Sequence, residues 1–212
     1  MTAIDTARLK HMFDAIAVAI EADKDRLCQL DGVIGDADHG IAMALGFGAV
    51  RDALEPLDLA AIEPTALLNT AAKSFLNAVG ASSGPLYATA LMRGAAAIKG
   101  KAALADADVI ALFQAMTQGI KDRGKAEIGE KTMIDAWQPA AQAAATAHAA
   151  GKSLAESLDA AFAAAERGAE ATKDMIAAKG RSSRLGERSL GHIDPGAASA
   201  VTVIGAMKSS LG

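Results

Sequence analysis

The sequence predicts an all-α protein, folded as a single-domain up-and-down barrel of about eight antiparallel helices. Alanine, the strongest helix former, occurs 53 times among the 212 residues. Aromatic residues, which favour strands, make up only 3% of the chain. Apolar residues recur at spacings of three, four and seven along most of its length, as they do on one face of a helix. These observations exclude an all-β fold.

The helices follow one another along the chain. The first, 5–29, carries an apolar stripe made of Leu9, Met12, Phe13, Ile16, Ile20 and Leu27. The second, 40–54, turns Met43, Phe47, Val50 and Leu54 inward. A proline in the first turn begins the helices at 64–79, 85–99 and 195–210. Apolar periodicity predicts the remaining helices at 106–122, 132–150 and 153–178.

Composition narrows the class of protein. No linker rich in Pro, Gly or Ser divides residues 1–212, so we expect one domain. The 21 basic and 25 acidic residues form no basic cluster, which argues against nucleic-acid binding. A single cysteine, Cys28, excludes an internal disulfide and indicates a reduced, cytoplasmic protein. No signal peptide is visible at the N-terminus.

Residues 74–92 carry no charge, which raises the alternative of a membrane span. Their middle reads Gly80-Ala81-Ser82-Ser83-Gly84-Pro85, a sequence that a spanning helix would not tolerate at mid-membrane. We therefore expect two shorter helices joined by a loop, and no membrane association.

Four of the seven connections are unusual in sequence: 31–40, 80–84, 123–132 and 180–194. They are the first, third, fifth and seventh connections. In an up-and-down topology every second connection lies at the same end. The unusual loops are therefore predicted to meet at one end of the barrel, which places the functional site there.

The first of these loops holds Asp31, Asp36 and Asp38 within eight residues. Three carboxylates so close together repel one another unless a cation lies among them. Oxygen ligands favour a hard ion, and the absence of an EF-hand pattern favours magnesium over calcium. The alternative, equally weighted from this loop alone, is that the aspartates cap the next helix and form Asx turns.

The other loops carry weaker signals. His39 and Gly40 begin a helix, and a helix N-terminus suits a phosphate, although a capping or buried histidine is the more frequent case. Lys131 is a candidate phosphate contact, unless Glu130 and Thr132 merely cap the following helix. The 180–194 loop contains Arg181, and an ordered loop of this length in a compact domain is usually functional.

At these loops the sequence resembles the L subunit of bacterial dihydroxyacetone kinase, the nucleotide-binding half of that enzyme family. The resemblance spans nearly the whole chain. Its anchors are Ile34-Gly35-Asp36-Ala37-Asp38-His39-Gly40, Ser83-Gly84-Pro85-Leu86-Tyr87, Gly129-Glu130-Lys131-Thr132-Met133-Ile134-Asp135, and the stretch from Gly180-Arg181 through Leu185-Gly186-Glu187-Arg188-Ser189-Leu190-Gly191-His192-Ile193-Asp194-Pro195-Gly196.

The resemblance implies an eight-helix barrel that holds ADP or ATP at one end through two magnesium ions. It implies that Asp31, Asp36 and Asp38 are the metal ligands. It places near the phosphates His39, Gly40, Ile41, Ala42, Ser82 and Ser83. It places around the rest of the nucleotide Gly124, Met133, Arg181, Asp194, Pro195 and Gly196.

Four positions depart from the family pattern. Ala37 replaces a glycine, which we expect to be a mild change, and Ala42 replaces an asparagine that would contact the nucleotide. Glu130 stands where the family usually has aspartate, and Arg184 where it often has an aromatic residue. These changes bear on the substrate and the phosphoryl donor more than on the chemistry.

The resemblance implies phosphoryl transfer to dihydroxyacetone held by a separate K subunit. Two donors stay open: bound ADP rephosphorylated by a phosphohistidine protein of the phosphotransferase system, or free ATP. Another short ketose such as erythrulose is an alternative substrate. A nucleotide-dependent regulatory binding protein is an alternative of a different class. The sequence also leaves a homodimer open.

Overall fold

The computed structural model describes residues 3–212, and this part of the chain folds into eight α-helices and two 3-10 helices. Apart from one isolated antiparallel bridge between Ile4 and Leu104, the described part has no β-structure. No helix within it is long and apolar enough to cross a membrane. The elements are α1 (Thr6–Ile34), α2 (His39–Leu54), α3 (Pro64–Ala78), α4 (Ser83–Ala97), α5 (Asp106–Gly124), α6 (Ile134–Ala149), α7 (Leu154–Ala171), η1 (Thr172–Asp174), η2 (Arg181–Ser189) and α8 (Pro195–Leu211).

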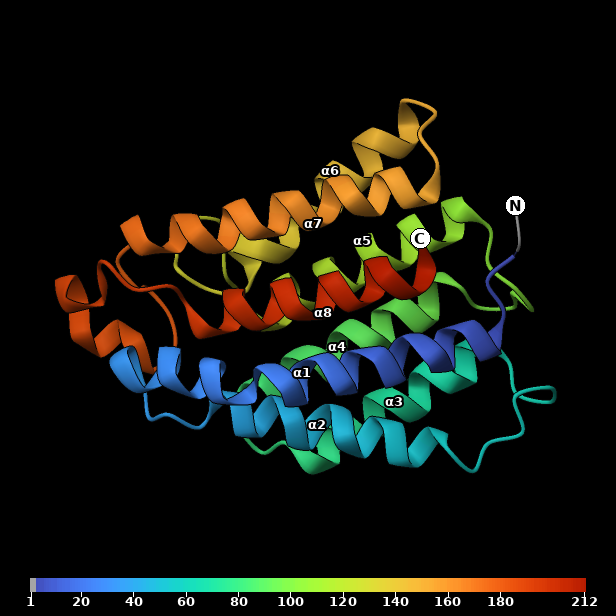
Figure 1. The fold of residues 1–212 in the computed structure, drawn as a ribbon, viewed down its shortest axis with the longest axis horizontal. Coiled ribbons are helices and arrows are strands. Elements are labelled where there is room, and N and C mark those ends of the chain that lie inside the picture. Colours follow the sequence, from blue (N-terminus) through green and yellow to red (C-terminus); the bar gives the residue numbers. More distant parts are fainter. Residues whose placement is uncertain (1–2) are drawn as a thin grey trace.

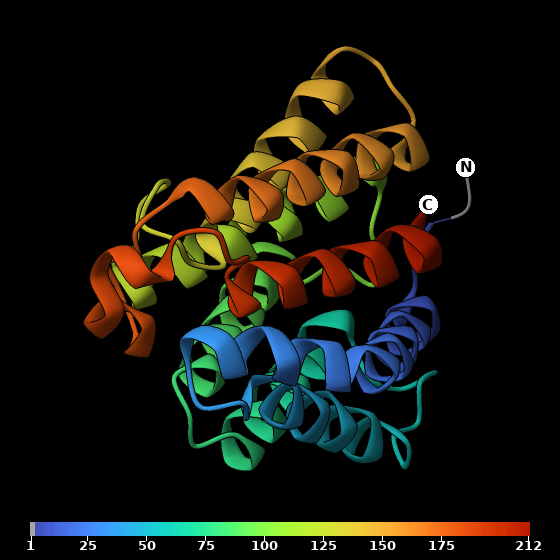
Figure 2. The ribbon, with the colours of Figure 1, turned by 60° about the vertical axis from the view of Figure 1, so that its left-hand side comes forward.

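The helices form a closed ring. Each α-helix packs against the next one along the chain, and α8 packs against α1 to close the circle. Figure 1 shows the helices side by side with alternating direction, and Figure 2 shows the same arrangement from a turned viewpoint. The predicted all-α, up-and-down barrel is therefore confirmed.

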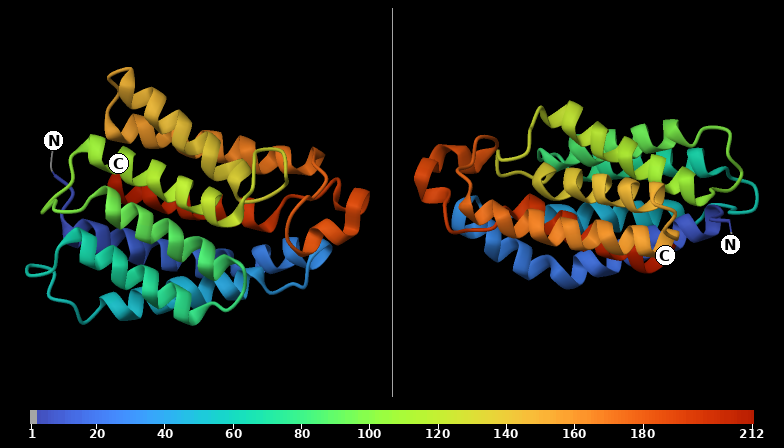
Figure 3. Two further views of the ribbon diagram at one scale, coloured as in Figure 1. Left: turned by 180° about the vertical axis from the view of Figure 1, so that it is seen from behind. Right: turned by 90° about the horizontal axis from the view of Figure 1, so that it is seen from above.

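The two ends of the barrel differ. The start of α1, the end of α8 and the α2–α3, α4–α5 and α6–α7 connections lie at one end, on the right of Figure 1. The other four connections lie at the opposite end, together with η2. Figure 3 shows this grouping from behind and from above. The prediction that the unusual loops meet at one end is confirmed.

Local signals explain most helix starts. The Asp5 carboxylate caps α1 by accepting a hydrogen bond from the Arg8 N–H at 2.8 Å. Ser153 and Glu156 form a reciprocal capping box at the start of α7. Pro64 and Pro195 stand in the first turns of α3 and α8, as expected.

The first helix is longer than predicted: it runs to Ile34 rather than residue 29. Ile34 is buried at 2% exposure, so the extra turn adds buried apolar surface. The helix ends where the Gly35 N–H bonds to the Asp31 carbonyl at 2.5 Å and the backbone leaves helical geometry. Asp31 therefore belongs to the helix rather than to the loop after it.

The seventh helix is shorter than predicted: it ends at Ala171 rather than 178. Thr172 begins the tighter η1 turn, where its carbonyl accepts a bond from the Met175 N–H at 3.2 Å. The same carbonyl also accepts a bond from the Lys131 ammonium. Long-range contacts thus end a helix that local propensity would continue. The 180–194 loop, in turn, contains the 3-10 helix η2.

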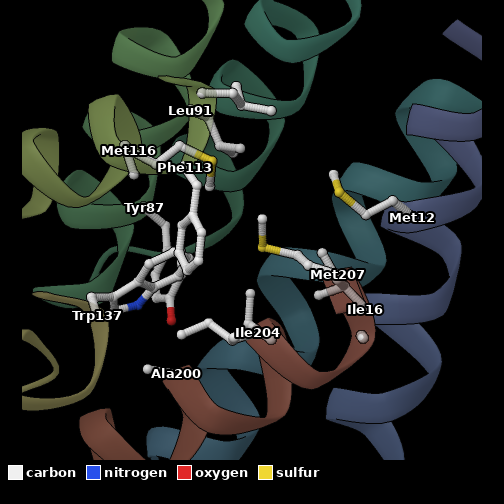
Figure 4. Close-up of a cluster of buried hydrophobic side chains, with 14 of the residues drawn as sticks. Met12, Ile16, Tyr87, Leu91, Phe113, Met116, Trp137, Ala200, Ile204 and Met207 are labelled. Carbon is white, nitrogen blue, oxygen red and sulfur yellow. The ribbon is translucent and has the colours of Figure 1, made fainter. Parts of the chain in front are cut away.

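Three aromatic residues, Tyr87, Phe113 and Trp137, meet among the buried hydrophobic side chains (Figure 4). The Trp137 ring lies edge-on to Phe113 at a centroid distance of 5.4 Å and to Tyr87 at 6.3 Å. Small residues let the surrounding helices approach. A Cβ at Gly168 would lie 1.9 Å from the Asp135 carbonyl oxygen, so only glycine fits where α7 crosses α6.

Candidate functional site

Three carboxylates gather where α1 passes into α2. Asp31 projects from the last turn of α1, and Asp36 and Asp38 come from the loop that follows. One carboxylate oxygen from each residue lies within 4.8 Å of the others. Asp31 is buried at 8% exposure, whereas the other two are open to solvent. Oxygen donors at this spacing suit a hard divalent cation.

The loop takes this shape because Asp31 organises it. Its Oδ2 accepts bonds from the N–H groups of Asp38, at 3.0 Å, and His39, at 3.2 Å. A Cβ at position 35 would lie 2.1 Å from the Asp31 Oδ1 atom, so Gly35 leaves room for this carboxylate. The sequence also allowed that the aspartates cap the second helix, and this is correct for Asp31, whose carboxylate caps the start of α2.

Ala37 adopts a left-handed backbone conformation, with φ of +61°. Glycine enters this region freely, whereas an L residue with a Cβ pays about 1 kcal/mol. The replacement of the family's glycine by alanine is therefore more costly than the mild change expected from sequence. The cost falls within the loop that carries Asp36 and Asp38.

His39 lies at the start of α2 and is largely buried. Its Nε2 atom is 2.9 Å from the Ser199 hydroxyl of α8, which fixes the orientation of the ring. Burial lowers the pKa of His39, and the Asp31 carboxylate opposes this shift. The ring is thus held between the acidic loop and α8.

A pocket of about 410 Å³ opens beside the three carboxylates, at the end of the barrel where the unusual loops meet. All four of these connections contribute to its wall. The predicted site residues that line it are Asp31, Asp36, Asp38, His39, Ala42, Ser82, Ser83, Gly124, Met133, Arg181, Asp194, Pro195 and Gly196.

Two predicted site residues, Gly40 and Ile41, do not line the pocket. Gly40 packs α2 against α1, because a Cβ there would lie 2.0 Å from the Lys24 carbonyl oxygen. The Ile41 side chain is 50% exposed and borders a separate surface groove along α1 and α2. Their backbone N–H groups, however, belong to the first turn of α2, which has no acceptors within its own helix.

The pocket also has an apolar wall that the sequence reasoning missed. It consists of Leu86, Ile120, Ala126 and Ile134, next to the predicted Ala42 and Met133. These residues follow the ordinary helical spacing of core positions, so no sequence signal separates them from the rest of the core. The pocket therefore combines apolar side chains with the three carboxylates.

The connection between α3 and α4 brings two hydroxyl groups to the pocket. Ser82 is exposed at the N-cap of α4, where its side chain makes no capping hydrogen bond, and Ser83 is buried. A Cβ at Gly84 would lie 2.0 Å from the Val79 carbonyl oxygen, which explains the glycine at this tight turn. The N-terminus of α4 therefore points its first N–H groups toward the pocket end of the barrel.

The turn before α6 is built around a buried carboxylate. Asp135 accepts bonds from the N–H groups of Gly129, at 2.6 Å, and Thr132, at 2.7 Å. Glu130 accepts the Glu127 N–H at 2.8 Å and so closes the preceding turn rather than capping α6, whereas the Thr132 hydroxyl accepts the Ile134 N–H at 3.2 Å at the start of α6. Lys131 also lines the pocket, but its ammonium group bonds to backbone carbonyls.

Two charged residues of the last connection face the pocket. The Arg181 guanidinium forms an ion pair with Asp36. Asp194 caps α8 by accepting the Ala197 N–H at 2.7 Å. Burial raises the pKa of Asp194 to about 7, although this hydrogen bond and the Lys131 ammonium lower it. Arg184, a departure from the family pattern, is exposed and lies outside the pocket wall.

Fold and site together define an all-helical barrel with a pocket at one end that holds a cluster of three carboxylates. Residues 33–209 match the model of the DAK2 domain, and the chain belongs to this family. This confirms the resemblance seen in the sequence.

Among its relatives is the PEP-dependent dihydroxyacetone kinase 2, ADP-binding subunit DhaL, of Listeria innocua. It is 35% identical over 92% of this chain and 90% of its own length. The PEP-dependent dihydroxyacetone kinase, ADP-binding subunit DhaL, of Escherichia coli is 39% identical over 84% of this chain and 83% of its own. The D-erythrulose kinase of Mycolicibacterium smegmatis is 34% identical over 88% of this chain but only 32% of its own.

The solved structures agree in fold. The dihydroxyacetone kinase of C. freundii matches 99% of this chain with a TM-score of 0.75 and 25% identity. The same enzyme in complex with AMP-PNP and Mg2+ matches with a TM-score of 0.73 and 26% identity. This chain spans only about a third of these kinases, since it covers 36% and 35% of their lengths.

Proposed function

We propose that this chain is the ADP-binding subunit of a dihydroxyacetone kinase and works through magnesium. The observation that carries the proposal is the meeting of three carboxylates and the N-terminus of α2 in one pocket. The relatives that match nearly their full length are named as ADP-binding subunits of such kinases. A structural neighbour binds AMP-PNP and Mg2+.

The donor set fits magnesium. Asp31, Asp36 and Asp38 supply only carboxylate oxygens, and their spacing of less than 4.8 Å allows shared coordination. We assign these three residues as ligands of two magnesium ions. When bound, magnesium neutralises charge on phosphate oxygens and so aids phosphoryl transfer.

The two sides of the pocket suit the two parts of a nucleotide. We place the phosphates at the starts of α2 and α4, where unpaired N–H groups and the helix dipoles attract anions. His39, Ser82 and Ser83 would contact them through side chains, and Gly40 and Ile41 through backbone N–H groups. The base would lie against the apolar wall beside Ala42, Gly124 and Met133. Arg181 and the turn 194–196 would close the remaining side.

The chain's own residues then position the phosphates rather than the sugar. We infer that a separate K subunit holds the ketose. We also infer that ADP stays bound and is rephosphorylated by a phosphohistidine protein of the phosphotransferase system, in the cytoplasm. The names of the relatives support this donor, because one is a PTS-dependent kinase subunit that is 37% identical over 84% of this chain. The erythrulose kinases, which support the alternative of another short ketose as substrate, match over about a third of their length.

Reconstitution tests this proposal. The purified chain is mixed with a K subunit, the phosphotransferase proteins, phosphoenolpyruvate and dihydroxyacetone, and formation of the ketose phosphate is followed. We expect product only when both subunits are present. A chain that alone turns over ketose and ATP at about 1–100 per second, the usual range for kinases, would contradict the partner requirement. Product formed from ATP but never from phosphoenolpyruvate would replace the proposed donor by ATP.

A further inference from the structure

Lys131 is a buried lysine at the rim of the pocket. Its side chain is only 2% exposed, and its Nζ donates hydrogen bonds to the carbonyls of Thr172 and His192, each at 2.5 Å. The turn holds it rigidly: Lys131 has a left-handed φ of +58°, and the bonds to Asp135 close the backbone on both sides of it. The backbone therefore aims the ammonium group inward.

The two carbonyls, of Thr172 and His192, flank the two ends of one segment, residues 173–191, and we call these paired ends the base of the segment. The chain leaves η1 and α7 at Thr172 and returns to α8 after His192. Two further bonds close the same base: Gly191 N–H to the Lys173 carbonyl at 2.8 Å, and Asp194 N–H to the Thr172 hydroxyl at 2.9 Å. The Lys131 ammonium group thus connects the two ends of the segment that contains η2.

This segment contributes part of the pocket wall, including Arg181 and Gly180. Its outer part is largely exposed. The closed base therefore directs it toward the acidic loop together with two further bonds, from the Ala177 N–H to the Ser189 hydroxyl at 3.0 Å and from the Ala178 N–H to the Glu130 carbonyl at 3.1 Å. Burial lowers the pKa of Lys131, and the carboxylates of Asp194, Asp135 and Asp174 oppose this shift. Removal of the ammonium group would take a donor from the buried Thr172 carbonyl, which is costly, and would release the more exposed His192 carbonyl at the other end of the segment.

We propose that Lys131 is a positioning residue that holds the base of segment 173–191 closed and thereby places Arg181 at the pocket, and that it does not bind phosphate. The effect of Lys131 on nucleotide affinity rests on the proposed function, whereas its role in holding segment 173–191 closed is independent of that function.

Chemical labelling of the wild-type protein separates the two roles without a substitution. The folded chain is treated with an amine-acylating reagent, with and without ADP and magnesium, and each lysine is followed by mass spectrometry. We expect Lys131 to react at least tenfold more slowly than the exposed Lys125 under both conditions. Rapid labelling that only ADP suppresses would make Lys131 a phosphate ligand and overturn the proposal.

Hydrogen exchange of the protein without nucleotide tests the positioning role itself. Lys131→Met keeps the length of the side chain but removes its donors. Lys125→Met is the matched control, since Lys125 also has a left-handed backbone, with φ of +49°, but is exposed. Exchange across 173–191 should accelerate at least tenfold in Lys131→Met only, with α3 and α5 unchanged. Unchanged exchange across 173–191 would refute the proposal.

A double-mutant cycle connects this role to the nucleotide. We expect Lys131→Met to weaken ADP binding about tenfold in the wild type, but less than twofold in an Arg181→Ala background. Equal losses in both backgrounds would show that Lys131 does not act through Arg181. Absence of any ADP binding by the wild type would instead refute the proposed function and leave the exchange result standing. If Lys131→Met does not fold, the labelling result decides alone.

Discussion

The Arg181 guanidinium lies against the Asp36 carboxylate and so links the long connection before α8 to the acidic loop before α2. Both side chains are partly exposed, so the ion pair itself adds little stability. The ion pair matters because it positions Arg181 beside the acidic loop. A cation bound by Asp31, Asp36 and Asp38 would compete with Arg181 for Asp36, which leaves the guanidinium available to a phosphate.

We therefore predict opposite effects of Arg181→Ala on the two ligands. Magnesium affinity measured without nucleotide should rise, because a competing cation is removed. Affinity for magnesium-ADP should fall by roughly 1.5–3 kcal/mol, the usual scale for a hydrogen bond to a charged group. Isothermal titration measures both. A ketose-transfer defect with unchanged nucleotide affinity would move Arg181 to a surface that faces the partner.

The left-handed conformation of Ala37 predicts a stabilising substitution. Ala37→Gly should raise the free energy of unfolding by about 1 kcal/mol, because glycine adopts φ of +61° without a Cβ clash. The control is Ala111→Gly, at an exposed position inside α5, which should cost about 1 kcal/mol. Thermal and urea denaturation compare them. A destabilised Ala37→Gly variant would show that the loop gains nothing from glycine.

Asp194 should make stability depend on pH. Burial raises its pKa to about 7 in the folded chain, above the ordinary value of 3.8, so the folded state holds a proton that the unfolded state releases between these values. Stability from this group is full below pH 3.8 and is lost as pH rises through 7. Asp194→Asn keeps a side-chain oxygen that can cap α8, but it has no carboxyl group to ionise, so its stability does not fall as the pH rises.

The advantage of Asp194→Asn over the wild type should therefore grow from about pH 4 to pH 8, by on the order of a few kcal/mol. Urea denaturation across this range, without magnesium or nucleotide, measures it. An advantage that stays constant with pH would mean that Asp194 is ionised at the same pH in both states.

Much of the fold was predictable because its signals are local. Pro64 and Pro195 mark the starts of α3 and α8, and Ser153 with Glu156 marks that of α7. The errors arise where distant residues decide. Burial of Ile34 extends α1, and the bond from Lys131 to the Thr172 carbonyl accompanies the end of α7. Neither effect is visible in a local window of sequence.

The position of the candidate pocket was predictable from the sequence, but not every residue that lines it. The alternating order of the connections was enough to predict that the four unusual loops lie at one end of the barrel. The acidic cluster was recognisable because Asp31, Asp36 and Asp38 lie within eight residues. The resemblance, rather than any pattern, supplied Gly124 and Met133, whereas the length of the 180–194 loop had already drawn attention to Arg181. The apolar wall around Leu86 and Ile120 was missed because apolar residues at helical spacing look the same in a core and in a pocket.

Nucleotide should order the pocket end selectively. Hydrogen exchange across 180–196 should slow when ADP and magnesium are added, because phosphate orders the arginines of this connection. The connections 55–63 and 150–152, at the opposite end, should barely change. Equal protection at both ends would mean that the site lies elsewhere.

The most direct test of the account is the affinity of Asp36→Asn for ADP in the presence of magnesium, measured by isothermal titration. Asp52→Asn is the control, since Asp52 is exposed on α2 and lies outside the pocket. Helical circular dichroism should be intact in both variants, and without magnesium Asp36→Asn should be slightly more stable, because one like charge is removed. We predict that Asp36→Asn abolishes magnesium-dependent binding and that Asp52→Asn binds as the wild type does. Unchanged ADP affinity in Asp36→Asn would contradict it.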